Sequence, residues 1–517
     1  MSLARTRTVV LVGVQGHLVE VEAYLGVGVP SYALVGLPDA SLAESRDRVR
    51  AAVVNSGQDW PSTKRVTVNL SPASLPKRGS SLDLAIAAAI LAAEQAVPPG
   101  AFDTAVLIGE LGLDGRVRPV RGVLPAVAAA AAAGVPAVVV PAANEAEAAL
   151  VPDVRVTGVR SLRELVALAR GEQPPDIGPV DVRLAAAEAE ADDGMPMPDL
   201  ADVRGQETAR YLLEVAAAGG HHLLMLGPPG AGKTMLAERL PALLPALDRA
   251  SALEVTAVHS VAGTLPAGMP LVTGAPFQAP HHTASVPSIV GGGSTHLRPG
   301  AASLAHRGVL FLDEAPEFAP GVLDALRQPL ESGEISVFRL AAQVRFPARF
   351  QLVLAANPCP CGLAVGKGTA CRCTAAARLR YLGRLSGPLL DRVDLRMEML
   401  PPTRAALRGD ASGLEDTVTV AARVSAARDR SARRLLGTPW RVNAEVPGYV
   451  LRREWRLAGD AAGPAERELE RGVLTARGFD RVLRVAWTLS DLAGRDRPDA
   501  GDVGVALQYR GVERNAA

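Results

Sequence analysis

The sequence predicts an α/β protein with an additional helical part, and three features predict it. The apolar run HHLLML (221–226) precedes GPPGAGKT (227–234), after which a helix-forming segment begins. A second apolar run, GVLFLDE (308–314), ends in two acidic residues. Residues 1–170 alternate between strand-like and helical segments, with glycine and proline at the joins. Strands that alternate with helices are typical of α/β folds, because the helices cover the faces of the sheet.

The glycine-rich stretch 227–234 has the pattern of a P-loop in the strand–turn–helix context that this motif requires. Its glycines let backbone N–H groups wrap a phosphate, and the following helix adds the positive end of its dipole. Lys233 is expected to reach the β- and γ-phosphates, and Thr234 to ligate Mg²⁺. The pattern therefore predicts ATP and Mg²⁺ as cofactors. The residues expected to bind them are Gly227, Pro228, Pro229, Gly230, Ala231, Gly232, Lys233 and Thr234.

The acidic strand end supplies the second half of this site. Asp313 is expected to hold the Mg²⁺ and its water shell, and Glu314 to polarise the attacking water. A buried strand with an acidic end and no catalytic role is the alternative. Both halves in one chain favour ATP hydrolysis.

We expect four parts along the chain. Residues 1–170 form a mixed α/β domain, and 171–198, which are rich in proline and acidic residues, form a linker. The nucleotide-binding core runs from 199 to 400. Residues 401–517 are rich in arginine and alanine with helical apolar spacing, so they form a helical domain.

Composition narrows the function classes. The chain has 517 residues and a net charge of +1, which gives no support for an overall basic nucleic-acid coat. Aromatic residues make up 3%, which argues against a surface dominated by base stacking. Gly13 and Gln15 interrupt the first apolar run, and the alanine run 126–134 is too short to span a bilayer. We therefore expect a cytoplasmic protein without a membrane partner.

All four cysteines lie in one short segment with the spacing C-x-C-x9-C-x-C. Two close pairs joined by a glycine-containing loop suit a tetrahedral Zn²⁺ bound by four thiolates. The single residue inside each pair is tighter than the usual zinc spacing, so reduced thiols and a redox pair remain alternatives. The expected zinc ligands are Cys359, Cys361, Cys371 and Cys373.

Four longer stretches resemble the YifB/ComM family of Mg-chelatase-like AAA+ ATPases. The resemblance implies an αβα-sandwich core with a helix-2 insert, a helical lid and assembly into a ring, expected to be a homo-hexamer. The stretches are APFQAPHHTASVPSIVGGG (275–293), RPGAASLAHRGVLFLDEAPEF (298–318), NPCPCG (357–362) and RLSGPLLDRVDL (384–395).

The N-terminal domain also resembles a known fold. PKRGSSLDLAIAAAIL (76–91) and GELGLDGRVRPVRGVLPAV (109–127) are similar to the Lon-type proteolytic domain, which has the ribosomal S5 domain 2-like fold. That family uses a Ser–Lys dyad. Ser81 falls at the serine position, whereas the lysine position falls on Leu124, which accepts no proton, and Lys77 is not the family's base. We expect no protease activity and interpret Ser81 as a helix N-cap.

The AAA+ resemblance implies three further catalytic residues. Asn357 stands at the sensor 1 position, where its amide aligns the water; a plain turn residue is the alternative. Arg392 acts on the γ-phosphate of the neighbouring subunit, with Arg384 as a rival and a salt bridge to Asp391 or Asp394 as the alternative. Arg477 is the sensor 2 candidate, with Arg481 as its competitor.

Three segments beside these motifs have weaker assignments. Gln206 resembles the motif on the nucleotide-base side. His281 and His282 lie in the insert, where they suit a loop or pore role better than a metal site. ISVFRLAAQVRFP (335–347) resembles a hairpin that lines the pore of related helicases.

The same resemblance implies a DNA substrate, because ComM-type proteins are linked to branch migration in natural transformation. We therefore expect a ring-forming ATPase and helicase-like motor that remodels or translocates branched or single-stranded DNA. A chelatase-type motor, an ATP-dependent protease or protein-remodelling factor and a non-enzymatic scaffold are the alternatives. Leu124 weakens the protease hypothesis, and the lack of a recognisable integrin-like domain weakens the chelatase one.

Overall fold

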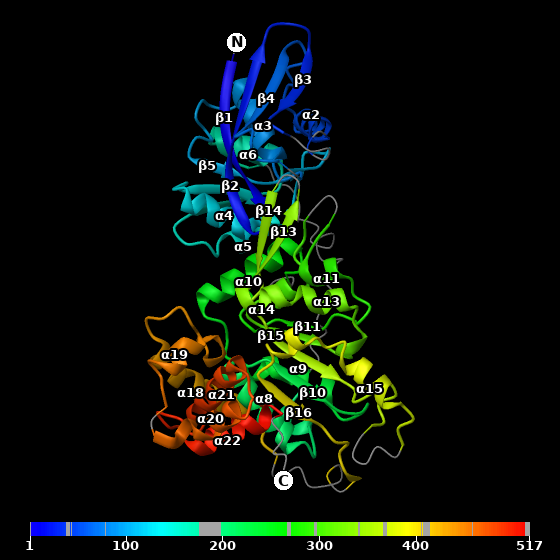
Figure 1. The fold of residues 1–517 in the computed structure, drawn as a ribbon. Helices are drawn as coiled ribbons and strands as arrows, with labels where there is room; N and C mark the ends of the chain where they lie inside the picture. Colours follow the sequence, from blue (N-terminus) through cyan, green and yellow to red (C-terminus); the bar gives the residue numbers. More distant parts are fainter. Residues whose placement is uncertain are drawn as a thin grey trace. The chain divides into compact units, whose positions relative to one another are not determined.

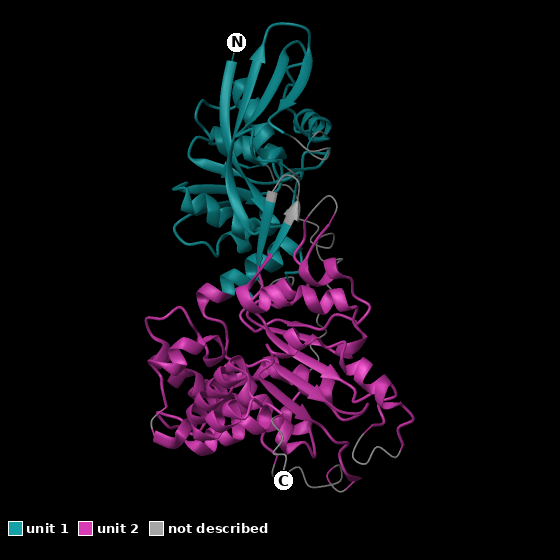
Figure 2. Ribbon diagram, in the orientation of Figure 1, with its two compact units in different colours: residues 1–193, 252–272, 336–346 teal, residues 194–251, 273–335, 347–517 magenta. Residues whose placement is uncertain are grey.

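The computed structural model divides the chain into two compact units (Figure 2). The first contains residues 1–193, 252–272 and 336–346, and the second contains 194–251, 273–335 and 347–517. Most of the predicted linker lies outside the described residues. The structure describes residues 2–511 except 38–41, 43, 78, 175–197, 266–269, 294–296, 340–341, 365–369, 405, 407–413 and 458, and the side chains of 338, 339 and 342.

The first unit is built on a seven-stranded mixed sheet in the order β3-β4-β2-β1-β5-β8-β9. β1 and β2 form a long antiparallel hairpin, while β5, β8 and β9 run parallel to one another. Every second residue of β2 and β4 is buried, as expected for strands whose other face is less covered. The strands are β1 (Ser2–Val12), β2 (Gln15–Gly26), β3 (Ser31–Val35), β4 (Arg65–Ser71), β5 (Ala105–Leu107), β8 (Ala137–Pro141) and β9 (Arg155–Val159).

Helices cover both faces of this sheet with separate cores. α3 is almost entirely buried and shares a core with α2 and α6, whereas α4 and α5 belong to a second core. A short ribbon, β6 (Glu110–Leu111) with β7 (Val117–Arg118), lies beside α3. The helices are α2 (Ser45–Asn55), α3 (Asp83–Ala93), α4 (Val123–Ala132), α5 (Glu145–Ala148) and α6 (Leu162–Arg170).

The predicted N-cap role of Ser81 is wrong. α3 begins at Asp83, its N-cap is Leu82, and no side chain caps it. The Ser81 carbonyl instead accepts a hydrogen bond of 2.9 Å from the Gly109 N–H. Leu124 is buried in α4, and its N–H donates to Oε1 of Glu147 at 2.9 Å. The residue at the family's lysine position therefore offers no side-chain base.

Two segments that we assigned to the nucleotide-binding core pack with the first unit instead. The carbonyl of Ser260, in the C-terminal half of α10 (Arg249–Ala262), accepts a hydrogen bond of 3.2 Å from the Gly122 N–H. At Gly13, an added Cβ would lie 2.7 Å from Cγ1 of Val344 in the predicted hairpin. The hairpin exists as β13 (Glu334–Arg339) and β14 (Ala342–Pro347), and its tip lies outside the described residues.

The second unit contains a five-stranded parallel sheet in the order β11-β12-β15-β10-β16 (Figure 1). β12 and β15 are buried along their whole length, which explains their continuous apolar sequences. The insert between β11 and β12 contains α11 (Val286–Val290) and α12 (Ala301–Leu304). The strands are β10 (Leu223–Leu226), β11 (Phe277–Gln278), β12 (Val309–Leu312), β15 (Gln351–Ala356) and β16 (Leu395–Glu398).

The C-terminal helices join this unit and do not form a separate domain. α18 and α21 contact α8 (Glu207–Gly219), and one hydrophobic core extends from the sheet into these helices. Among the described residues, no helix combines the length and apolar character needed to cross a membrane. The C-terminal helices are α18 (Thr417–Leu435), α19 (Gly448–Arg452), α20 (Gly463–Glu470), α21 (Ala476–Leu492) and α22 (Ala500–Tyr509).

Candidate ATP site

The P-loop connects β10 to α9 (Lys233–Leu243) in a conformation that requires glycine. Gly230 and Gly232 have φ angles of +78° and +91°, which other residues rarely adopt. At Gly227 an added Cβ would lie 2.8 Å from the carbonyl oxygen of Met399, just beyond β16. The backbone therefore bends at two positions and approaches a neighbouring segment closely at the third. This loop, which begins a helix, fits a bound phosphate.

Lys233 folds back over this loop. Its Nζ donates to the carbonyl oxygens of Gly227 at 2.7 Å and Pro228 at 3.0 Å, and to Oδ1 of Asn357 at 3.2 Å. Burial lowers the pKa of Lys233, while the nearby carboxylates of the acidic strand act in the opposite direction. The ammonium group thus lies next to the loop, and phosphate oxygens of a bound nucleotide would replace these hydrogen bonds.

The structure brings the predicted magnesium ligands together. Oγ1 of Thr234 donates to Oδ2 of Asp313 at 2.6 Å, and Oδ1 of Asp313 accepts from the Glu314 N–H at 2.8 Å. A hydroxyl paired with a carboxylate at the end of a neighbouring strand suits Mg²⁺, which prefers oxygen ligands and retains several waters. These residues fit the ion that a nucleotide would bring.

Glu314 has an unusual backbone and an unforeseen neighbour. Its φ is 49°, in the left-handed region that costs energy for a residue other than glycine and that clusters at functional sites. Nδ1 of His282 lies 3.4 Å from Oε2 of Glu314. The ring of His281 is tilted against that of His282, with 4.0 Å between the ring centroids, so His282 connects the histidine pair to Glu314. The position of His282 beside Glu314 was not predicted from the sequence.

Asn357 emerges between the two halves of the site because of the strand order. β15 lies between β10 and β12, so its carboxyl end points to the gap between Lys233 and Asp313. Asn357 is half-buried, and burial raises the pKa of the neighbouring Tyr381 to about 12, while the Asn357 backbone acts in the opposite direction. Gln206 also belongs here, since its Nε2 donates to the carbonyl oxygen of Ala231 in the P-loop at 3.0 Å.

Arg392 does not join the P-loop of its own chain. Arg392 forms an ion pair with Glu331, and not with Asp391 or Asp394, which were the expected alternatives. It also donates to the Pro388 carbonyl at 2.5 Å. The rival Arg384 is paired with Glu317, at 3.1 Å, close to the acidic strand end.

The sensor 2 candidates share a cavity with Arg392. Arg477 is exposed in the first turn of α21, whereas Arg481 pairs with Asp394. A cavity of about 1270 Å³ is lined by Arg392, Arg477 and Arg481, and none of residues 227–234, all of them described, lines it. The cavity that holds these three arginines therefore does not include the phosphate loop of the same chain.

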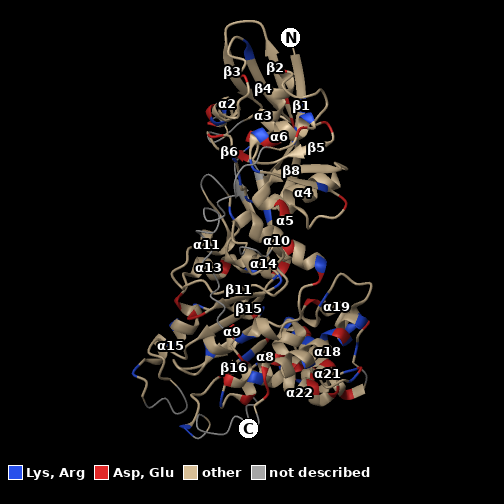
Figure 3. Cartoon of the chain, turned by 180° about the vertical axis from the view of Figure 1, so that it is seen from behind, with Lys and Arg blue, Asp and Glu red and all other residues tan. Residues whose placement is uncertain are grey.

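The arginines of the C-terminal helices are largely balanced by acids. Segments with Lys or Arg and segments with Asp or Glu both occur among the C-terminal helices (Figure 3). Arg434 pairs with Asp491, and Arg423 with Glu214 at 2.7 Å. Many basic residues of this region therefore serve packing between helices, and its composition alone does not indicate a nucleic-acid surface.

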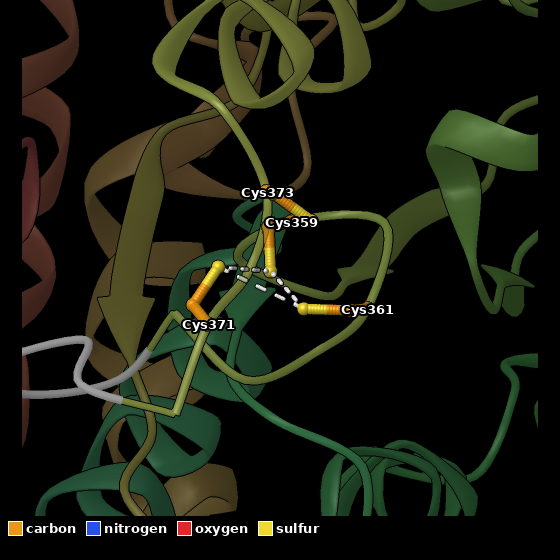
Figure 4. A group of neighbouring side chains, drawn as sticks. All are labelled: Cys359, Cys361, Cys371 and Cys373. Carbon is orange, nitrogen blue, oxygen red and sulfur yellow. Dashed lines mark hydrogen bonds between the residues drawn. The ribbon is translucent and has the colours of Figure 1, made fainter.

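The four cysteines converge next to the carboxyl end of β15 (Figure 4). Their sulfur atoms all lie within 4.8 Å of one another, and all four thiols are free. Cys359 is buried, whereas Cys361 is exposed. Gly362, in the same loop, approaches the P-loop so closely that an added Cβ would lie 2.6 Å from Cδ of Pro229.

Comparison with known proteins agrees with this site. Three families match, described as magnesium chelatase subunit ChlI (residues 199–407), subunit ChlI of Mg-chelatase (20–144) and the ChlI C-terminal part (414–510). Together with the P-loop and acidic strand, they define an ATPase of the Mg-chelatase-like AAA+ class, which implies ATP and Mg²⁺ as its cofactors.

Relatives match over the whole chain. The uncharacterized protein Rv2897c of Mycobacterium tuberculosis is 54% identical over 510 residues, covering 99% of both chains. YifB of Escherichia coli and the competence protein ComM of Haemophilus influenzae are each 40% identical, covering 99% of this chain and 98% of theirs. The chain belongs to the YifB/ComM family. Its likeness to Lon protease is more distant, 26% over 172 residues with the enzyme of Trichlorobacter lovleyi.

Proposed function

We propose that this chain forms a ring that uses ATP hydrolysis to remodel or translocate branched or single-stranded DNA. The observation that carries the proposal is a P-loop beside an acidic strand end, in a chain similar over nearly its full length to a competence protein. The DNA substrate follows from the family resemblance, and the charge distribution neither requires nor opposes it.

The ring is supported by the separation of Arg392 from the P-loop of the same chain. An arginine that neutralises charge on the γ-phosphate must come within hydrogen-bond distance of it. A neighbouring subunit supplies this contact, so the proposed active unit is a homo-oligomer, a hexamer by the family resemblance. Mass photometry with a non-hydrolysable ATP analogue tests the ring directly.

ATP turnover with a panel of DNAs tests the substrate. Phosphate release is measured with a Holliday junction, a fork, a duplex and a single strand, at low and at physiological salt. We expect the branched substrates to stimulate turnover most, and binding to weaken as salt rises because phosphate contacts release counterions. Wild-type protein that neither binds nor responds to any DNA at low salt would rule out this part of the proposal.

A chelatase-type motor is the second candidate, favoured by the three matching ChlI families. Its distinguishing readout is ATP-dependent insertion of Mg²⁺ into a porphyrin, alone or with added chelatase partner subunits. We expect no insertion. In either function the proposed resident cofactors are ATP with Mg²⁺ and one Zn²⁺ at the four cysteines, the zinc as a structural ion.

A further inference from the structure

We infer that Cys359, Cys361, Cys371 and Cys373 bind one zinc ion, and that this ion fixes the two parts of the ATP site that lie beside it. The S···S separations among the first three cysteines are 3.3 Å (Cys359–Cys361), 3.6 Å (Cys359–Cys371) and 3.7 Å (Cys361–Cys371). Four sulfur atoms about 2.3 Å from a central zinc form a tetrahedron with edges of roughly 3.8 Å. These three thiols already have the spacing of one face of such a tetrahedron, and the sulfur of Cys373 lies within 4.8 Å of each of them.

Packing alone does not explain this convergence. A free cysteine behaves as a small apolar side chain and is usually buried. Cys361 is exposed, and Cys371 and Cys373 are only half-buried, so the group does not form an apolar core. Its two pairs are separated by nine residues in the sequence, and bringing them together costs loop-closure entropy. A metal ion supplies the free energy for this ordering.

The first pair is connected to the catalytic residues through the backbone. Cys359 follows Asn357 by two residues, and the Gly227 N–H of the P-loop donates to the carbonyl of Ala356 at 3.1 Å. The Gly362 N–H donates to the Cys359 carbonyl at 2.9 Å, and Gly362 lies against Pro229. A zinc ion at Cys359 therefore holds the end of β15 and one wall of the P-loop.

The second pair reaches the same place through a helix. Cys373 immediately precedes Thr374, the N-cap of α15 (Ala375–Leu382). Tyr381 at the far end of α15 is buried, and the pKa of its hydroxyl, which burial raises, is lowered in part by the nearby Asn357 backbone. The second pair thus begins a helix whose far end returns to the neighbourhood of Asn357. Removal of the zinc would release Asn357 and the adjoining P-loop wall together.

The metal is tested first by its stoichiometry. We expect about one zinc per chain in the purified full-length protein by elemental analysis, and loss of most of it in the Cys361→Ser/Cys373→Ser double variant. Arg372→Ser is the matched control, because it changes the exposed residue between two ligands and leaves all four thiols. It should retain its zinc.

A spectroscopic measurement keeps the test valid if the double variant misfolds. Wild-type protein is stripped of metal with a chelator and loaded with Co²⁺, and we expect the intense visible absorption of tetrahedral cobalt bound by thiolates. The metal site would be overturned if the wild-type protein contained no zinc, showed no such absorption with Co²⁺, and had four thiols that react freely with a thiol reagent.

The connection to catalysis is tested with the same preparations, and it alone rests on the proposed ATPase function. We expect zinc removal to lower kcat for ATP about tenfold, with a smaller effect on KM, and added Zn²⁺ to restore it. Unchanged kcat in zinc-free, folded protein would overturn this connection. Zinc-loaded protein that never hydrolyses ATP would instead overturn the proposed function and leave the metal site standing.

Discussion

At the scale of single residues, we expect ATP hydrolysis to depend most directly on Glu314. We expect Glu314→Gln to lower ATP turnover at least about 100-fold while nucleotide binding persists, because the amide keeps the shape but does not accept a proton from water. Phosphate release and binding of a fluorescent ATP analogue measure the two effects. Glu334→Gln, at an exposed position, is the control and should retain turnover.

A second prediction concerns the backbone at Gly232. An added Cβ there meets no atom within 4 Å, so Gly232→Ala tests the φ of +91° without a clash. A left-handed conformation costs an alanine roughly 1–2 kcal/mol, and we expect ATP affinity to fall about tenfold as the loop relaxes. Gly504→Ala, which also has open space but lies in α22, should leave affinity unchanged. Equal affinities for both variants would contradict this account.

The residues of the candidate site could be predicted from the sequence where they belong to one short motif. Lys233, Thr234, Asp313 and Glu314 stand at fixed places after a strand, and the structure brings these residues together. The contact of His282 with Glu314 was not predictable from spacing. The order of β11 and β12 would have indicated it, since parallel neighbours end at the same edge of the sheet.

At the scale of elements, His222 links two strands of the core through an uncharged ring. Nδ1 of His222, next to the start of β10, accepts a hydrogen bond of 3.0 Å from the Leu352 N–H in β15. Burial lowers the pKa of His222 to about 4, with Asp394 acting to raise it and Arg481, His221 and Arg484 to lower it. The native state therefore resists protonation of this ring.

This shift predicts how the stability of the second unit depends on pH. The pKa of His222 is about 6.5 in the unfolded chain and about 4 in the native state. The unfolded state therefore binds the proton first as the pH is lowered. The contribution of His222 to the free energy of unfolding is fully present above pH 6.5 and is lost as the pH falls toward 4. We expect the free energy of unfolding to fall by about 2–3 kcal/mol between pH 7 and pH 4.5, and urea unfolding at the two pH values measures this change. His222→Gln, which keeps an acceptor but does not titrate, should show a smaller loss.

The strands of the core were predictable mainly where apolar residues follow one another without interruption. The apolar runs before the P-loop and around residue 310 became β10 and β12. β11 has two residues and β16 mixes apolar with charged residues, and neither was identified. The boundaries were harder, because residues 252–272 and 336–346 pack with the first unit through contacts distant in sequence, such as Gly13 with Val344. Local periodicity holds no information about such pairings.

At the scale of the whole molecule, the proposed ring predicts that the P-loop of one subunit acts together with Arg392 of its neighbour. Chains with Lys233→Ala lack a working P-loop but keep Arg392, and chains with Arg392→Ala have the reverse defect. Each variant alone should be inactive. In a mixture, a subunit with an intact P-loop meets an intact Arg392 on its neighbour, and turnover returns.

The expected recovery follows from counting interfaces in a head-to-tail ring. With equal amounts of both chains and random assembly, about one interface in four combines both intact partners, so turnover per chain should reach about a quarter of the wild-type value. Mass photometry confirms that mixed rings form. If the mixture stays inactive while a mixture of Lys233→Ala with Arg384→Ala recovers, Arg384 is the arginine that acts across the interface. Recovery in neither mixture would mean that neither arginine acts across it.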